Sequence, residues 1–385
     1  MSSKMKPRFK TDIKLLTQRQ MISWLGQRKI ASYRAAQIFR WIYQHQADSF
    51  AEMTNIGKDC RELLASHFSI QRLEKVRVES SRDGSRKYLF RLHDGEHIES
   101  VLIPEKDHHT LCISVQAGCV QGCRFCLTAK DGFRRNLTSG EIIAQIRDIA
   151  NEIQENIPAQ NPPAGVSGAT SLTNIVLMGM GEPLANYENV IRALDIIANR
   201  DFGLCFSNRR ITLSTAGLIS RFSNLCRDTK INLAVSLNAS DNATRDRLMP
   251  INRKYPLEKL IEACRQYKLS PRQRITFEYI LMKGVNDSPE DAGSLAKLLR
   301  PVKAKINLIP FNEYEGSEFE RPDESVIQGF RETLIQHNYT VIIRRSKGQD
   351  ISAACGQLRS GKRCRGNNLQ NCSAGVPEKV YGPEP

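Results

Sequence analysis

Three cysteines, Cys119, Cys123 and Cys126, lie within eight residues of one another in a CxxxCxxC pattern. Three thiolates at this spacing can hold three corners of an iron–sulfur cube, whereas most clusters take four cysteines. The fourth iron is then left without a protein ligand and can bind a substrate or a second cofactor. Phe125 precedes the last cysteine and would shield one face of the cluster. The pattern therefore predicts a cluster with one open coordination position.

A structural zinc site is the alternative interpretation of the same cysteines. Such sites usually take four ligands, and here the fourth would be His108, His109 or a distant cysteine. A zinc-bound RNA-binding module without catalysis therefore stays open as an alternative. The CxxxCxxC pattern with an aromatic residue before its last cysteine resembles the radical S-adenosylmethionine (SAM) superfamily, and this resemblance favours the iron–sulfur cluster.

Length and composition limit the class of protein. The 385 residues suffice for two or three domains, and 40% hydrophobic with 25% charged residues is typical of a soluble globular protein. No apolar run approaches 18 residues, so no membrane partner is expected. The basic N-terminus has no apolar segment after it and does not resemble a secretory signal. We therefore expect a cytoplasmic protein.

The charge balance and the cysteine count point to nucleic acid and to thiol chemistry. The net charge is +15, from 56 Lys and Arg against 41 Asp and Glu. Such an excess favours a polyanionic partner, although a basic surface without function is the alternative. The 11 cysteines show no even spacing, which favours metal-binding and catalytic roles over structural disulfides.

The first hundred residues read as two small units before the main domain. Apolar residues at helical spacing predict a basic helical domain over residues 1–75, which we interpret as an RNA-docking module. Short β-rich runs separated by Asp-Gly turns predict a β-hairpin extension over residues 76–104. The predicted helices cover Leu15–Leu25, Ser32–His45 and Asp59–Phe68, and the predicted strands cover Lys75–Glu79, Lys87–Leu92 and His97–Ile103.

Residues 105–345 alternate between strands and helices, which predicts a parallel sheet and an α/β partial (βα) barrel of six or seven units. The first strand is expected at Leu111–Ala117, and a capping-box pattern at Thr138–Glu141 opens the next long helix. The polar and glycine clusters all follow strands, where barrel enzymes place their chemistry. Residues 346–385 lose periodicity and hold Cys355, Cys364 and Cys372.

Gly181, Glu182 and Pro183 follow a predicted strand, next along the chain after the cysteine loop. Such a segment is often only a turn, but here its carboxylate could bind the methionine ammonium group of SAM. Ser214, Ser236 and Asn312 also follow strands and could hydrogen-bond the SAM carboxylate and ribose. Isolated residues of these types are more often strand-end caps, so the interpretation depends on their convergence.

Longer motifs resemble the RlmN/Cfr family of radical-SAM RNA methyltransferases, and the match runs from about Arg8 to Leu358. The motifs are Cys126-Leu127-Thr128-Ala129, Gly132-Phe133-Arg134-Arg135-Asn136-Leu137-Thr138, Gly140-Glu141-Ile142, Met178-Gly179-Met180-Gly181-Glu182-Pro183-Leu184, Ile309-Pro310-Phe311-Asn312 and Asp350-Ile351-Ser352-Ala353-Ala354-Cys355-Gly356-Gln357-Leu358.

The resemblance implies a role for each matching residue. Cys355 would accept a methyl group and become S-methylcysteine, Cys112 would be the second catalytic thiol, and Glu99 would be the base that abstracts a proton. Asn238 stands where the family often has histidine, and asparagine can still donate and accept. Cys119, Cys123 and Cys126 would hold one 4Fe–4S cluster per chain, and SAM would be bound by Gly181, Glu182, Ser214, Ser236, Leu237, Asn238 and Asn312.

The implied reaction methylates C2 of adenine 2503 in 23S ribosomal RNA, and also adenine 37 of transfer RNA, with two SAM molecules per turnover. One SAM methylates Cys355, and the other yields a radical that activates this methyl group. Cys112 then releases the product by forming a transient disulfide with Cys355. Pro183 favours this chemistry over the alternative of C8 methylation of the same ribosomal adenine. The resemblance also implies an electron donor such as flavodoxin and a monomeric enzyme.

Overall fold

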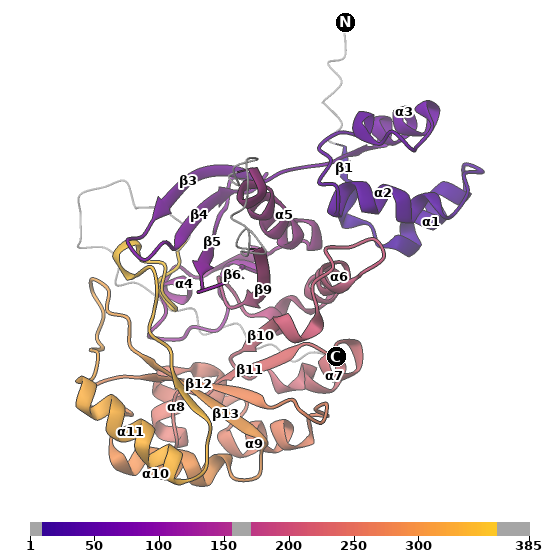
Figure 1. Cartoon of the computed structure of the whole chain (residues 1–385). Helices are drawn as coiled ribbons and strands as arrows, with labels where there is room; N and C mark the ends of the chain where they lie inside the picture. The colour runs from indigo at the N-terminus through magenta and orange to yellow at the C-terminus, as the bar shows by residue number, and fades with distance from the viewer. Residues whose placement is uncertain (1–9, 156–170, 360–385) are drawn as a thin grey trace, which may run out of the picture.

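The computed structural model describes residues 10–155 and 171–359. Within these ranges, ten strands form one sheet in the order β14, β13, β12, β11, β10, β9, β6, β5, β4, β3 (Figure 1). The strand order in space therefore follows the order of the chain. The bounds are β3 Glu74–Ser80, β4 Arg86–Arg91, β5 His97–Pro104, β6 His108–Cys112, β9 Ser171–Leu177, β10 Ile211–Thr215, β11 Asn232–Ser236, β12 Ile275–Leu281, β13 Ala304–Pro310 and β14 Val341–Ile343.

The larger part of the sheet, β6 and β9 to β14, is parallel. In its register Leu111 lies opposite Ile175, and Val235 lies opposite Phe277. In the described part of the chain β14 and β3 are the two edges of the sheet, so it does not close into a full barrel. An open parallel sheet with crossover helices confirms the predicted α/β partial barrel.

Helices join the parallel strands, and α5 packs beside α6 while α10 packs beside α11. Helix α9 buries Leu257, Leu260, Ile261 and Cys264 on one face, as helical spacing of apolar residues requires. The helix bounds are α4 Leu127–Lys130, α5 Ser139–Glu155, α6 Tyr187–Ala198, α7 Phe222–Asp228, α8 Asn242–Leu248, α9 Leu257–Gln266, α10 Pro289–Leu299 and α11 Glu324–Gln336.

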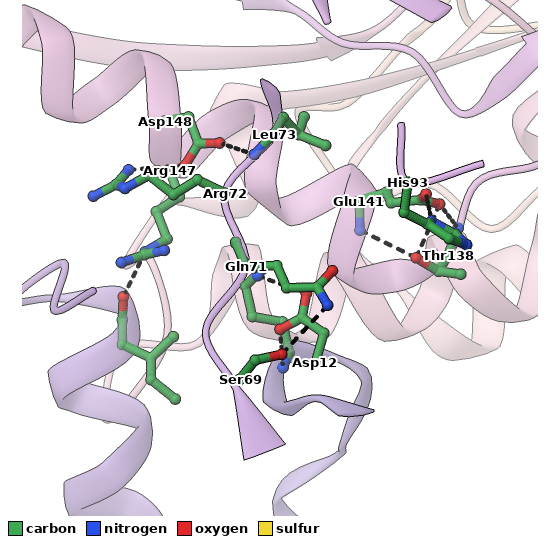
Figure 2. Close-up of polar contacts among 12 residues, drawn as sticks. Asp12, Ser69, Gln71, Arg72, Leu73, His93, Thr138, Glu141, Arg147 and Asp148 are labelled. Carbon is green, nitrogen blue, oxygen red and sulfur yellow. Dashed lines mark hydrogen bonds and ion pairs between the residues drawn. The ribbon is translucent and has the colours of Figure 1, made fainter. Parts of the chain in front are cut away.

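The predicted capping box at the start of α5 is present. The Thr138 hydroxyl accepts a hydrogen bond from the Glu141 backbone N–H at 3.2 Å, and a Glu141 carboxylate oxygen accepts one from the Thr138 N–H at 2.8 Å. These two bonds pair N–H groups that a helix start otherwise leaves unpaired. The helix therefore begins where the sequence pattern places it (Figure 2).

Strands β3, β4 and β5 are antiparallel and extend the parallel sheet beyond β6. They are the predicted hairpin set, and tight turns with left-handed glycines, Gly84 and Gly95, connect them. Glu99 lies on β5 opposite Leu89 and is buried. The division of the chain at residues 75, 104 and 345 stays a prediction.

The N-terminal segment forms α1 Gln18–Gly26, α2 Arg34–Tyr43 and α3 Lys58–His67, with a short parallel pair of β1 Thr11–Asp12 and β2 Phe68–Ser69. Its apolar residues belong to the same buried cluster as those of the barrel. Met21 and Phe39 share this cluster with Ile142 of α5. The helical segment is therefore packed onto the barrel.

Two guanidinium groups reinforce this packing (Figure 2). Arg147 of α5 is fully buried and donates to the Ile42 carbonyl at 3.0 Å and to the Asp48 carboxylate at 2.9 Å. Arg72 bridges Asp48 and Asp148 at 2.7 and 2.8 Å. Buried charges held by several acceptors are geometrically demanding, so they fix the angle at which the helical segment meets the barrel.

Two expectations about elements are wrong or incomplete. The predicted strand Leu111–Ala117 is not one strand, because β6 ends at Cys112 and β7 Gln116–Gly118 pairs with β8 Phe133–Asn136 in a separate sheet. Ser114 leaves the main sheet because its N–H donates to the Gln145 side chain at 2.8 Å.

Helices α7 and α8 were not predicted, since seven residues are too few to show helical periodicity. In the described residues, no helix is long and apolar enough to span a membrane.

Candidate active site

The cysteine loop begins at Gly118, at the end of β7. Gly118 has a φ of +76°, and a side chain there would overlap the Gly132 carbonyl oxygen. The next residue, Cys119, donates its N–H to that same oxygen at 3.2 Å. The loop ends at Cys126, which is the N-cap of α4. A glycine is therefore required where the chain turns into the loop.

The three loop cysteines line one cavity of about 170 Å³ at the carboxyl ends of the parallel strands. Burial raises the pKa of Cys119 to about 12 and also raises the pKa values of Cys123 and Cys126. The closeness of the other two thiols raises the pKa of Cys123 further. Three clustered thiols of this kind become thiolates when a positively charged centre binds them.

In the described residues, no three His, Cys, Asp or Glu side chains converge on a point where one metal ion could sit. A cube differs from a single ion because each cysteine ligates a different iron, so its ligands need not converge. The donor set of Cys119, Cys123 and Cys126 therefore fits an iron–sulfur cube. It offers no fourth cysteine on the loop, which leaves one iron for SAM.

Gly181 and Glu182 lie beside the loop and line the same cavity. Gly181 has a φ of +100°, and a Cβ there would lie 2.5 Å from Cβ of Gln116. The two Glu182 carboxylate oxygens accept the N–H groups of Leu184 at 3.0 Å and Ala216 at 2.7 Å. These hydrogen bonds lower the pKa of Glu182, but burial has the larger effect and raises it. The carboxylate is thus fixed in place at the cavity wall.

Three neighbouring strands contribute a polar row to the cavity. Ser214 of β10 and Ser236 of β11 have hydroxyl oxygens 3.5 Å apart, and Ser214 donates to Glu278 of β12 at 2.9 Å. Glu278 lies in register with Ser236. Sequence reasoning missed Glu278, although a single acid in the otherwise largely apolar strand Ile275–Leu281 was a signal. Burial raises its pKa.

Asn238 also lines the cavity, but Leu237 and Asn312 are not among its lining residues. Asn238 has a left-handed backbone with a φ of +59°, and its side-chain oxygen accepts the Ile280 N–H at 2.9 Å. The Asn312 side chain donates to the Cys355 carbonyl at 3.2 Å. Asn312 therefore contacts the loop of Cys355, and the prediction that Leu237 and Asn312 bind SAM stays a prediction.

Cys112, at the end of β6, and Cys355 both line the cavity and are free thiols. Burial raises the pKa of Cys112, and the nearby Cys355 raises it further. Burial also raises the pKa of Cys355 to about 11, with Glu278 as the next cause. The structure thus brings together two thiols that are 243 positions apart in the sequence.

Hydrogen bonds hold the segment of Cys355 on both sides. After the cysteine, the carbonyls of Gly356 and Leu358 accept bonds from the cluster-loop side, from the Leu127 N–H at 2.8 Å and the Thr128 hydroxyl at 2.6 Å. Before it, the chain is tied to the β3–β4 turn, where Asp83 accepts the Gly348 N–H at 2.7 Å. Cys364 and Cys372 lie outside the described residues.

Glu99 is 2% exposed and is not among the lining residues of the cavity. One carboxylate oxygen lies 3.4 Å from Nζ of Lys87, and the other accepts the Arg359 N–H at 2.9 Å. Burial raises the pKa of Glu99, and Lys87 partly opposes that rise. The C-terminal segment therefore contacts Glu99, the predicted base, directly through the Arg359 N–H.

An open parallel sheet whose strand ends carry a CxxxCxxC loop and a Gly-Glu segment defines a radical SAM enzyme. Residues 113–296 match the model of the Radical SAM superfamily. Residues 11–70 match the Ribosomal RNA large subunit methyltransferase N-terminal domain. A 4Fe–4S cluster and SAM are the cofactors of that superfamily. The N-terminal match narrows the class to enzymes that modify ribosomal RNA.

The chain belongs to the RlmN family. A dual-specificity RNA methyltransferase RlmN from Desulfosudis oleivorans is 57% identical over 357 residues, which are 93% of each chain. A protein of the same name from Geobacter sulfurreducens is 51% identical, over 90% of this chain and 92% of its own. The crystal structure of a radical SAM methyltransferase from Sphaerobacter thermophilus matches with a TM-score of 0.83, at 41% identity, over 91% of this chain and 99% of its own.

Proposed function

We propose that this enzyme methylates C2 of an adenine in 23S ribosomal RNA and of an adenine in transfer RNA. The single observation that carries the proposal is the placement of Cys112 and Cys355 in the same cavity as the three loop cysteines. A conventional methyltransferase needs no such pair of thiols. The RlmN name of the relatives supports dual specificity and disfavours both the C8 alternative and a non-catalytic zinc protein.

The chemistry that a bound 4Fe–4S cluster supplies is one-electron cleavage of SAM at the iron that has no protein ligand. Cys119, Cys123 and Cys126 would hold the cluster at the cavity wall. Glu182, whose carboxylate is held by two backbone N–H groups, faces the place where the SAM ammonium group is expected. Ser214, Ser236 and Asn238 would position the rest of SAM.

Cys355 is the methyl acceptor in this proposal, because it is an exposed residue on an otherwise largely buried segment and it lines the cavity. An electron-poor adenine carbon cannot attack the SAM methyl group, so the methyl must first reside on the protein. After the carbon–carbon bond has formed, the radical adduct gives up one electron and Glu99 accepts the ring proton. The Cys112 sulfur then attacks the sulfur of Cys355, so that a disulfide forms as the bond between the Cys355 sulfur and the methylene carbon breaks. The released carbon takes up a proton, which completes the methyl group and frees the RNA.

The experiment is a reaction of the reconstituted enzyme with a 23S RNA fragment or a transfer RNA and methyl-labelled SAM. Mass analysis of the digested nucleosides should find the label in 2-methyladenosine from both RNAs. Label in 8-methyladenosine would contradict the regiochemistry, and label from only one RNA would contradict dual specificity. Without added reductant, label should reach Cys355 and no nucleoside.

We also propose a low-potential one-electron donor such as flavodoxin, a monomeric enzyme and a cytoplasmic location. The need for a donor follows from the one-electron cleavage of SAM. All the site residues named above belong to one chain, which supports a monomer. Size-exclusion chromatography with light scattering tests the monomer, and a mass near twice 43.5 kDa would contradict it.

A further inference from the structure

Arg245 is a fully buried arginine on α8 that no part of the mechanism above uses. Its guanidinium donates to the Ala216 carbonyl at 2.8 Å, to the Leu237 carbonyl at 3.0 Å and to the Asn252 side-chain oxygen at 2.9 Å. A weaker contact reaches the Ser236 carbonyl at 3.3 Å. The guanidinium therefore lies directly behind the ends of β10 and β11, where residues that line the cavity are found.

Arg245 has hydrogen-bond acceptors but no counter-charge. Across residues 10–155 and 171–359, it forms no ion pair with an Asp or Glu side chain. The neighbouring Asp246 carboxylate accepts the Asn252 amide instead, at 2.7 Å. A buried cation without an ionic partner is costly, and proteins normally pair it. Within the described residues, Arg245 is therefore a buried cation whose charge no carboxylate ion pair balances.

The cluster loop lies next to this guanidinium. The Arg124 N–H donates to the Leu248 carbonyl at 3.0 Å, which joins the loop to the end of α8. Cys123 packs against the apolar cluster that contains Ala216 and Leu248. The cation and a cluster-binding thiol thus share one buried region.

We propose that Arg245 is the buried counter-charge of the iron–sulfur cluster and raises its reduction potential. A cube bound by three thiolates carries net negative charge, and reduction adds one more negative charge. A fixed cation nearby stabilises the reduced form more than the oxidised form, and low local dielectric strengthens the effect. Arg245 is therefore a positioning residue, since it acts through the cluster.

This role of Arg245 rests on the proposed function, because it requires that the three loop cysteines bind the cluster. A failure of that ligation would be seen first, because the unsubstituted protein would then bind no iron. The predicted size is an approximately tenfold change in the one-electron equilibrium constant. For a one-electron couple, this equals about 59 mV.

The test is a dithionite titration of the full-length reconstituted chain, with redox mediators and with the spin signal of the reduced cluster as readout. Arg245→Gln and Arg245→Met should lower the potential by about 59 mV. Arg245→Lys keeps the charge and should recover at least half of that loss. The matched control is Arg247→Gln, an exposed arginine on the same helix, which should leave the potential unchanged.

A second control separates charge from packing. Asn252→Leu removes one acceptor of Arg245 but leaves its charge, so the potential should stay at that of the unsubstituted protein. Equal potentials in the Gln, Met and unsubstituted proteins at equal iron content would overturn the proposal. An Arg245→Lys variant whose potential is no higher than that of Arg245→Gln would also overturn it. Gln and Met variants whose iron-free forms do not fold would overturn it too, since the role of Arg245 would then be structural. Loss of iron from variants whose iron-free forms melt normally would support it.

Discussion

The proposed mechanism gives each of the two thiols in the cavity, Cys112 and Cys355, a separate task, and single substitutions should separate the tasks. In Cys112→Ala, the disulfide cannot close, so RNA should remain covalently attached to Cys355 and copurify with the protein. Gel electrophoresis under denaturing conditions with labelled RNA measures this adduct. Cys264→Ala, a buried cysteine of α9 outside the cavity, is the control.

Normal turnover of Cys112→Ala without an adduct would contradict the release step or would mean that another thiol replaces Cys112. Cys364 and Cys372 are the candidates in the tail. A triple substitution of Cys112, Cys364 and Cys372 distinguishes the two explanations. If a tail thiol replaces Cys112, the triple variant should accumulate the RNA adduct. If the release step does not use Cys112, the triple variant should still turn over. Cys355→Ala should instead stop before any methyl group reaches protein or RNA.

The pH dependence of the reaction should depend on Lys87. Burial raises the pKa of Glu99 and the Lys87 charge lowers it, so Lys87→Met should raise this pKa further. Glu99 must be ionised to accept a proton, and ionisation is lost as pH falls through its pKa. The acid limb of the pH–rate profile should therefore move to higher pH. Lys75→Met on β3 is the control, and an unmoved limb would argue against Glu99 as the base.

At the scale of elements, the β3–β4 turn holds the segment of Cys355. Asp83→Ala removes the acceptor of the Gly348 N–H. Loss of one hydrogen bond of about 1 kcal/mol should make Cys355 roughly fivefold more reactive toward iodoacetamide. Peptide mass spectrometry measures the rate. Arg82→Ala lies in the same turn and should have no effect, because the Arg82 backbone N–H, which the substitution keeps, is the group that donates to Asp350. Equal rates of Cys355 alkylation in both variants would refute the tether.

Helix α5 fixes the N-terminal helices through Arg147. Arg147→Met leaves the Ile42 carbonyl and the Asp48 carboxylate without this donor, and should lower the free energy of unfolding by about 3 kcal/mol. Urea denaturation followed by circular dichroism checks the value. Arg192→Met on the exposed face of α6 should change it by less than about 0.5 kcal/mol. A loss no larger than that of the control would show that apolar packing alone holds the helices.

The sequence was sufficient for elements with strong periodicity and insufficient for short or switching ones. The sequence pattern predicts a strand at Asn232–Ser236 and a helix at Pro289–Leu299, and these bounds agree with β11 and α10 because turn or cap residues border each run. The break after Cys112 was hidden because Ile113 and Val115 are as apolar as a strand requires. Both are buried, and their N–H groups still donate to the Val176 and Met180 carbonyls at 3.0 and 2.8 Å. Only the Ser114 N–H between them turns away, to the Gln145 side chain.

The site was predictable where a residue type is rare in its setting. Three close cysteines and a Gly-Glu segment are conspicuous in a sequence, whereas Glu278 and Arg245 each resemble ordinary charged residues. Their importance comes from their surroundings, because Arg245 is fully buried and Glu278 bonds to Ser214 of a neighbouring strand, and both depend on elements distant in the chain. The contact that Asn312 makes was not visible in the sequence, because its side chain donates to the carbonyl of Cys355, 43 positions further along the chain.

At the scale of the whole molecule, the excess positive charge should govern RNA affinity. Binding should weaken steeply with salt, because each phosphate contact releases a counterion and contributes about 0.7 to 0.9 to the slope of log K against log salt concentration. Substituting Gln for the exposed basic residues Arg19, Lys29 and Lys58 should reduce both affinity and slope. Fluorescence anisotropy at several salt concentrations measures both.

Substitution is preferable here to deletion of residues 1–75, because those helices share a buried core with the barrel. Deletion would expose apolar surface and would confuse loss of RNA contacts with loss of folding. Gln in place of Lys283, Lys297 and Lys303, basic residues outside the N-terminal helices, serves as the control. Equal slopes in both triple variants would contradict a special role for the N-terminal helices in docking.

The strand order of the sheet has a consequence for biosynthesis. Within the ten-stranded sheet, each strand after β3 pairs with the sheet strand that precedes it in the chain, so the sheet can grow in step with the ribosome that translates it. The cluster loop emerges about 230 residues before Cys355. A nascent or prematurely terminated chain that ends between Leu127 and Gly348 therefore contains every proposed cluster ligand and the thiol of Cys112, but not Cys355, the proposed methyl acceptor. Under the proposed mechanism, methyl transfer to RNA becomes chemically available only when the last described segment has been synthesised and has docked.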